Sequence, residues 1–174
     1  IEGFGEYGFP ESHAASFALL VWASCWLKHH EPACFLAAML NSQPMGFYSP
    51  RTLIADAQRH HVVFLPLDIQ KSDFDYTLEP TDPSERYPRW AVRLGFRSIF
   101  GIQEKHIQHL IAERTQHGPY RDLEDLVRRT QLPRHLLVSL AAAGGLSSFG
   151  FTPRSALWTL QSLQLDQRSL VFGR

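Results

Sequence analysis

The spacing of hydrophobic residues in the first third of the chain is that of helices. From residue 13 to about residue 30 apolar residues face nearly every side of a predicted helix, and Ser12 is placed to cap it. Further helices are predicted over about 32–40 and after Ser49, with Pro50 as the first helical residue. A helix that is apolar on all sides is typical of a segment buried in a larger body.

Beyond the third helix the hydrophobic period shortens to that of β-strands. Segments 62–69 and 75–78, together with the alternating run WAVRLGF, predict a small hairpin or a three-stranded sheet. Helical spacing returns at Glu104, and further helices are predicted after the break at HGPYRD, the last of them leading into a polar tail. The pattern therefore predicts a mainly α-helical chain with a small β element.

Charge divides the chain into two halves of opposite sign, although the formal net charge of all 174 residues is zero. Residues 1–85 hold four basic and eleven acidic residues, a net charge of −7. Residues 86–174 hold thirteen basic and six acidic residues, a net charge of +7. Fourteen of the 17 basic residues are arginine, whose planar guanidinium suits two-point contact with phosphate. The basic half is therefore the candidate surface for a polyanion.

Composition also limits the compartment in which the chain works. Two cysteines cannot form a disulfide framework, which favours a reducing, cytoplasmic location. The most apolar segment, 17–23, is far shorter than the ~20 residues that cross a bilayer. Because the sequence opens with Ile1 inside a glycine-rich aromatic stretch, we expect it to be a piece of a longer protein.

Two groups of side chains have spacings that metal ligands could use: Cys25, His29, His30 and Cys34, and Asp73 with Asp75. A thiol among tryptophan and leucine side chains is usually a small core residue, and a proline redirects the chain before the second cysteine. The two aspartates lie in an extended polar stretch, where solvated roles are typical. We therefore predict no metal site in the chain.

Longer motifs, in a fixed order, connect the chain to a family. Five stretches of the sequence resemble the bacterial C-family replicative polymerases, the alpha subunit of DNA polymerase III: GFGEYGFPESHAASFALLVWASCWLKHHEP, FLAAMLNSQPMGFYSP, LPLDI, LGFRSIFGI and LAAAGGL. The residues of the first two stretches are similar to those of the error-prone branch of this family. The resemblance covers about residues 1–160. It implies four regions: the helical end of the fingers (1–48), a helix with a small β linker (49–92), a tandem helix-hairpin-helix DNA-binding domain (93–150), and a helical linker and tail (151–174).

The resemblance also implies what the chain does. The carboxylates that hold two metal ions for nucleotidyl transfer belong to a palm domain upstream of Ile1, so Mg²⁺ is expected there and no cofactor is expected here. The chain is then expected to hold primer–template duplex during translesion or damage-induced synthesis without polymerising DNA itself. The alternative is a scaffold that binds the sliding clamp or accessory mutagenesis proteins without touching DNA. A third possibility, an independent enzyme, lacks a nucleophile–base pattern.

The stretch IFGIQEKHI, residues 99–107, is the candidate phosphate-binding hairpin. In such a hairpin a glycine allows a tight turn, and amides at the start of the next helix face one phosphate group. Phe100 and Gln103 depart from the usual basic-Gly-aliphatic-Gly run, so a purely structural turn is the alternative. For the arginines of a second helical pair the alternative is a solvated face near acidic residues. The predicted DNA-binding residues are Arg97, Gly101, Ile102, Gln103, Lys105, Arg128, Arg129 and Arg134.

Two further sites are predicted at the ends of the chain. Ser12 and His13 start the first helix, where free amides suit a nucleotide or primer phosphate, unless they serve only as a cap and a packed ring. The tail is similar to the peptide by which bacterial polymerases hold the sliding clamp. There Leu170 and Phe172 would enter an apolar pocket, and the Gln167 amide would fix the orientation of a flexible tail. A plain apolar terminus is the alternative.

Overall fold

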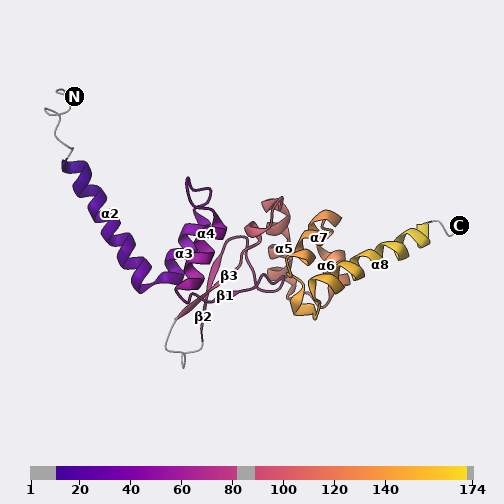
Figure 1. The fold of residues 1–174 in the computed structure, drawn as a ribbon. Coiled ribbons are helices and arrows are strands. Elements are labelled where there is room, and N and C mark those ends of the chain that lie inside the picture. Colours follow the sequence, from indigo (N-terminus) through magenta and orange to yellow (C-terminus); the bar gives the residue numbers. More distant parts are fainter. Residues whose placement is uncertain (1–10, 82–88, 172–174) are drawn as a thin grey trace, which may run out of the picture. The chain divides into compact units, whose positions relative to one another are not determined.

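The computed structural model describes residues 11–81 and 89–171, and the side chains of 13–81 and 89–162. Over these residues most of the chain is helical, and short strands form one small sheet (Figure 1). The predicted fold class, mainly α with a small β element, is therefore confirmed.

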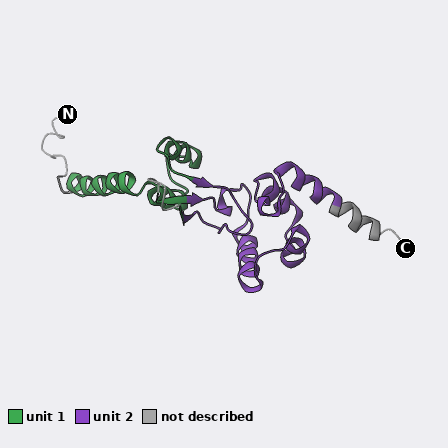
Figure 2. Ribbon diagram, turned by 90° about the horizontal axis from the view of Figure 1, so that it is seen from below, with its two compact units in different colours: residues 1–63, 80–91 green, residues 64–79, 92–174 purple. Residues whose placement is uncertain are grey.

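The chain divides into two compact units, and each unit takes two separate segments of the sequence (Figure 2). The first unit combines residues 1–63 with 80–91, and the second combines residues 64–79 with 92–174. The polypeptide therefore enters the second unit, returns to the first and enters the second again.

The described helices of the first unit are α2 (Glu11–His30), α3 (Pro32–Asn41) and α4 (Pro50–Arg59). Ser49 caps α4, as predicted, because its hydroxyl oxygen accepts a hydrogen bond from the Thr52 N–H at 3.2 Å. The predicted cap of the first long helix is wrong, since α2 already includes Ser12. A residue inside a helix has helical backbone angles, which an N-cap residue lacks.

Helix α2 carries the apolar surface that the sequence predicted, but the described residues do not bury it. Seven of its large apolar side chains are between 45% and 66% exposed: Phe17, Leu19, Leu20, Val21, Trp22, Trp26 and Leu27. The buried side chains of this unit come chiefly from α3, including Leu36 and Leu40. Along the described residues, no helix combines the length and the apolarity needed to cross a membrane.

The sheet contains β1 (Phe64–Leu65), β2 (Thr77–Pro80) and β3 (Trp90–Arg93) in the order β1-β3-β2. Strands β1 and β3 are parallel, with Leu65 opposite Arg93. A three-stranded sheet was one of the two predicted arrangements, and the parallel pair was not predicted.

Arg93 is a buried charge that joins distant parts of the second unit. Its Nε and Nη2 donate hydrogen bonds to the two carboxylate oxygens of Glu79, each at 2.7 Å, and its Nη1 donates to the Pro66 carbonyl at 2.8 Å. The hydrogen bonds from Arg93 hold the pKa of the Glu79 carboxyl below its usual range. Arg114 makes a similar link from a helix, since its Nη1 donates to the carbonyls of Ile69 and Ser72.

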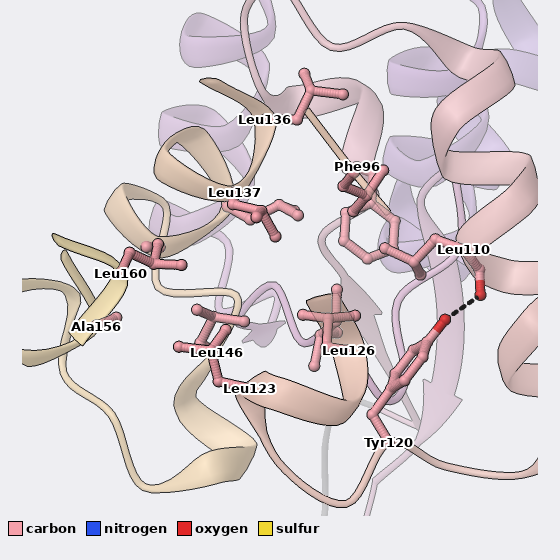
Figure 3. Packing of buried hydrophobic residues seen from close by; sticks show 14 of the residues in the cluster. Phe96, Leu110, Tyr120, Leu123, Leu126, Leu136, Leu137, Leu146, Ala156 and Leu160 are labelled. Atoms are coloured by element: carbon pink, nitrogen blue, oxygen red, sulfur yellow. Dashed lines mark hydrogen bonds between the residues drawn. The ribbon is translucent and has the colours of Figure 1, made fainter. Parts of the chain in front are cut away.

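The second unit is built around one buried cluster, to which each of its described α-helices contributes (Figure 3). The described α-helices of this unit are α5 (Glu104–His117), α6 (Leu123–Thr130), α7 (Arg134–Ala142) and α8 (Pro153–Val171). Short 3-10 turns, η1 (Phe96–Ser98) and η2 (Ser147–Phe149), precede α5 and α8. Phe96, Leu110 and Leu126 are fully buried in the cluster, and the Tyr120 hydroxyl donates to the Leu110 carbonyl at 2.7 Å (Figure 3). The turns between these helices are therefore held by a packed core.

Candidate nucleic-acid interface

Residues 99–103, the turn that precedes α5, form what we call the first hairpin. Gly101 has a φ of +76°, which glycine adopts without the steric penalty of a side chain. The Ile102 N–H donates to the Ile99 carbonyl at 3.3 Å, and both isoleucines pack against the buried cluster. Gln103 is extended and leads into α5. Apart from Gly101 and its two chain neighbours, no described residue lies within 4 Å of where a Cβ at position 101 would be, so another molecule can approach the backbone there.

Residues 131–133, between α6 and α7, form the second hairpin. Gln131 has a φ of +48°, and its N–H donates to the Val127 carbonyl at 2.9 Å. Leu132 is buried, and Pro133 then leads into α7 with ψ of 141°. The order is the same as in the first hairpin: a residue of positive φ, an inward apolar residue, an extended residue, and a helix. The sequence did not point to Gln131, because glutamine has no preference for a positive φ.

The helices that follow the two hairpins begin without a side-chain cap. Neither Gln103 before α5 nor Pro133 before α7 provides one. In contrast, side chains of Ser49, Asp122 and Thr152 accept hydrogen bonds from first-turn N–H groups of α4, α6 and α8. Helix α3 also lacks a side-chain cap, but it does not follow such a turn. Uncapped N–H groups and the positive end of the helix dipole together suit a bound anion at α5 and α7.

The two basic residues predicted at the first hairpin differ in what surrounds them. Lys105, in the first turn of α5, is exposed, and the described residues place no ion-pair partner beside it. Arg97 is only partly exposed, because its Nη1 lies 2.7 Å from Asp75 Oδ1 and its guanidinium lies 5.8 Å from the Phe74 ring centroid. Lys105 is therefore the more accessible cation at this hairpin.

At the second hairpin, Arg134 and Arg128 are exposed. Arg134 is the first residue of α7, where a cation lies beside the uncapped amides. Arg128 has a side chain that is 75% exposed, and its Nη2 lies 2.6 Å from Asp125 Oδ1. The hydrogen bond from Arg128 lowers the pKa of the Asp125 carboxyl. His135, which follows Arg134 and is also exposed, was not among the predicted residues.

Arg129 is turned into the protein and holds two helices together. Its Nη2 donates to the carbonyls of Glu113 at 2.7 Å and Gly118 at 3.1 Å, and its Nη1 donates to Asp125 at 3.3 Å. The guanidinium also lies 4.4 Å from the Tyr120 ring centroid, and the side chain is only 14% exposed. We therefore leave Arg129 out of the proposed interface.

The remaining predicted residues lie away from the hairpins in the sequence. His13 is exposed and its ring centroid lies 4.4 Å from that of Phe17, whereas the side chain of Ser12 is outside the described residues. Gln167 and Leu170 fall within the bounds of α8, with side chains that are not described, and Phe172 lies outside the described residues altogether.

The possible metal ligands can be placed as well. Both cysteines are free thiols, Cys25 exposed and Cys34 partly buried. Within the described ranges, no three His, Cys, Asp or Glu side chains gather as metal ligands would.

Comparison with known families finds a matching family model. A family model for the helix-hairpin-helix motif matches residues 61–156, more than half of the chain, and this range contains both hairpins. The chain belongs to the helix-hairpin-helix family. Within this range, the first hairpin joins η1 to α5 and the second joins α6 to α7.

Curated relatives of this helix-hairpin-helix chain include error-prone DNA polymerases. Proteins called error-prone DNA polymerase from Bdellovibrio bacteriovorus, Azoarcus sp. and Brucella melitensis are 56%, 52% and 48% identical to it. The matches cover 99%, 95% and 99% of this chain, but only 16%, 16% and 15% of the length of the relatives. The chain thus spans about a sixth of these relatives, and the resemblance to error-prone polymerases drawn from its sequence is confirmed.

Proposed function

We propose that this chain binds duplex DNA through its sugar–phosphate backbone, as a non-catalytic part of an error-prone DNA polymerase. The names of the relatives support the polymerase setting, and the helix-hairpin-helix family supports DNA as the ligand. In this proposal the parent protein copies DNA during translesion or damage-induced synthesis, and the hairpins keep the primer–template in place.

The observation that carries the proposal is the pair of hairpins with one backbone pattern, each followed by an uncapped helix. N–H groups at the starts of α5 and α7 are the donors that a phosphate oxygen would accept from. Lys105 and Arg134, in the first turns of these helices, each add a positive charge beside the donors. Contacts of this kind reach the backbone and not the base edges, so the binding is independent of DNA sequence.

Salt dependence of duplex binding tests the proposal. Each neutralised phosphate releases counterions, so the logarithm of the binding constant should fall with the logarithm of salt concentration by roughly 0.9 per contact. Replacing both Lys105 and Arg134 with glutamine should reduce that slope by about the amount expected for two phosphate contacts. The slope is measured by fluorescence anisotropy of a labelled blunt duplex at several salt concentrations.

The matched control is Arg51→Gln, because Arg51 is exposed in the first turn of α4 but lies in the other unit and after a capped start. This variant should keep the slope of the unchanged chain. A slope that is the same in the Lys105/Arg134 double variant, or no binding at low salt, contradicts the proposal and favours the protein-scaffold alternative.

A further inference from the structure

Phe100, at the first hairpin, has a completely exposed side chain. Aromatic side chains usually bury a large apolar area, and leaving one in water forgoes that free energy. Among the described residues, Phe47 in the first unit has a similar exposure, 99%. Phe100 differs from Phe47 in its place, since it immediately precedes Gly101 and lies four residues before α5.

The outward position of Phe100 is fixed by its neighbours. Ile99 and Ile102, which flank the Phe100–Gly101 pair, pack against the buried cluster. The Ile99 N–H donates to the Phe96 carbonyl at 3.0 Å, so the chain is tied to η1 just before Phe100. With both flanking residues anchored inward, the hairpin holds Phe100 on its solvent side.

We propose that Phe100 stacks on an unpaired nucleobase beside the phosphate that the first hairpin holds. The first hairpin then binds a junction between single-stranded and duplex DNA more tightly than a continuous duplex. This inference rests on the proposed function, because phosphate contact is what brings DNA to the hairpin. Every base has a π-face, so stacking on Phe100 adds no preference for sequence.

The distances along the chain allow one hairpin to contact a phosphate and a base. Phe100 lies four positions before the first residue of α5, and four steps along the chain span at most about 14 Å, which is enough to reach neighbouring nucleotides. In a continuous duplex each base is already stacked on both faces, so an apolar wedge must first separate a base step. An unpaired base at a junction avoids most of that cost. The exposed aromatic ring therefore favours a junction.

Two labelled DNA probes test the inference: a blunt duplex, and the same duplex extended by a single-stranded overhang. Affinities of the 174-residue chain and its variants are measured by fluorescence anisotropy. We expect Phe100→Ala to weaken binding to the overhang probe about tenfold, or about 1.4 kcal/mol, with little change for the blunt duplex. Phe100→Trp keeps an aromatic face and should retain the preference for the overhang.

The matched control is Phe47→Ala, because Phe47 is as exposed as Phe100 but lies far from the hairpins in the sequence. It should leave both affinities unchanged. Equal effects of Phe100→Ala on the two probes, no effect on either, or the same loss in Phe47→Ala overturns the inference. If the unchanged chain binds the blunt duplex with the expected salt dependence but Phe100→Ala does not weaken binding to the overhang probe, the inference alone is refuted. Failure of the unchanged chain to bind the blunt duplex refutes the proposed function.

Discussion

Tyr120 illustrates at the scale of one residue how burial changes chemistry. Burial raises the pKa of its phenol from 10.0 to about 12, and its hydroxyl donates to the Leu110 carbonyl. The folded chain therefore holds this proton at a pH where the unfolded chain releases it. The contribution to stability is complete below pH 10 and is lost as pH rises from 10 toward 12.

We predict that the free energy of unfolding falls in this window by up to about 1.4 kcal/mol per pH unit because of Tyr120. Tyr120→Phe should remove that part of the slope, and it should cost about 1 kcal/mol at neutral pH through the lost hydrogen bond. Urea unfolding followed at a series of alkaline pH values measures both effects. Tyr48, which is exposed, supplies the control Tyr48→Phe. An unchanged alkaline slope in Tyr120→Phe contradicts the prediction.

At the same scale, the structure agrees with the sequence-based predictions for some site residues and differs from them for others. Gly101 was predictable, since a glycine between aliphatic residues before an amphipathic helix indicates a tight turn. Gln131 was not, because glutamine has no preference for the positive φ that it adopts before the buried Leu132. Arg128 and Arg129 are alike in sequence but opposite in burial. One signal could have separated them: Arg129 is three residues after the buried Leu126, and so shares its helix face.

At the scale of elements, the sequence predicted helices well where local signals mark their ends. Proline and serine at the start of α4, and glycines after α7, act within one turn of the chain. The parallel pairing of β1 with β3 depends on residues far apart in sequence, so no local pattern contains it. The sequence also could not say what covers α2, because a helix that is apolar on all sides carries no information about its partner.

The contact between α5 and α6 is another property of elements, and Arg129 takes part in it. We predict that Arg129→Met lowers the free energy of unfolding by about 2–4 kcal/mol, because the carbonyls of Glu113 and Gly118 lose a charged donor. Urea denaturation measures the change. Arg128→Met is the matched control on the same helix, and its exposed side chain predicts a change within about 0.5 kcal/mol. Equal losses in the two variants would show that Arg129 does not join the helices.

At the scale of the whole molecule, the predicted clamp peptide would connect the proposed DNA binding to a partner protein. The motif Gln167-x-x-Leu170-x-Phe172 follows both hairpins in the sequence, and it stays a prediction. We expect the purified sliding clamp to be retained by the immobilised chain and lost on Phe172→Ala, because an aromatic anchor usually dominates such contacts. Gln164→Ala, just outside the motif, is the control. Retention of the clamp by the Phe172 variant counts against the peptide.

The division of the sequence between the two units limits which gene segment can encode the hairpins together with their supporting residues. Residues 64–79 contribute Leu67 and Ile69 to the cluster under the hairpins, and Glu79 neutralises the buried Arg93. A gene segment that began at residue 93 would encode both hairpins but would leave this guanidinium buried without its carboxylate. A transferred segment that carries both hairpins therefore also needs residues 64–79, which supply that carboxylate and part of the cluster.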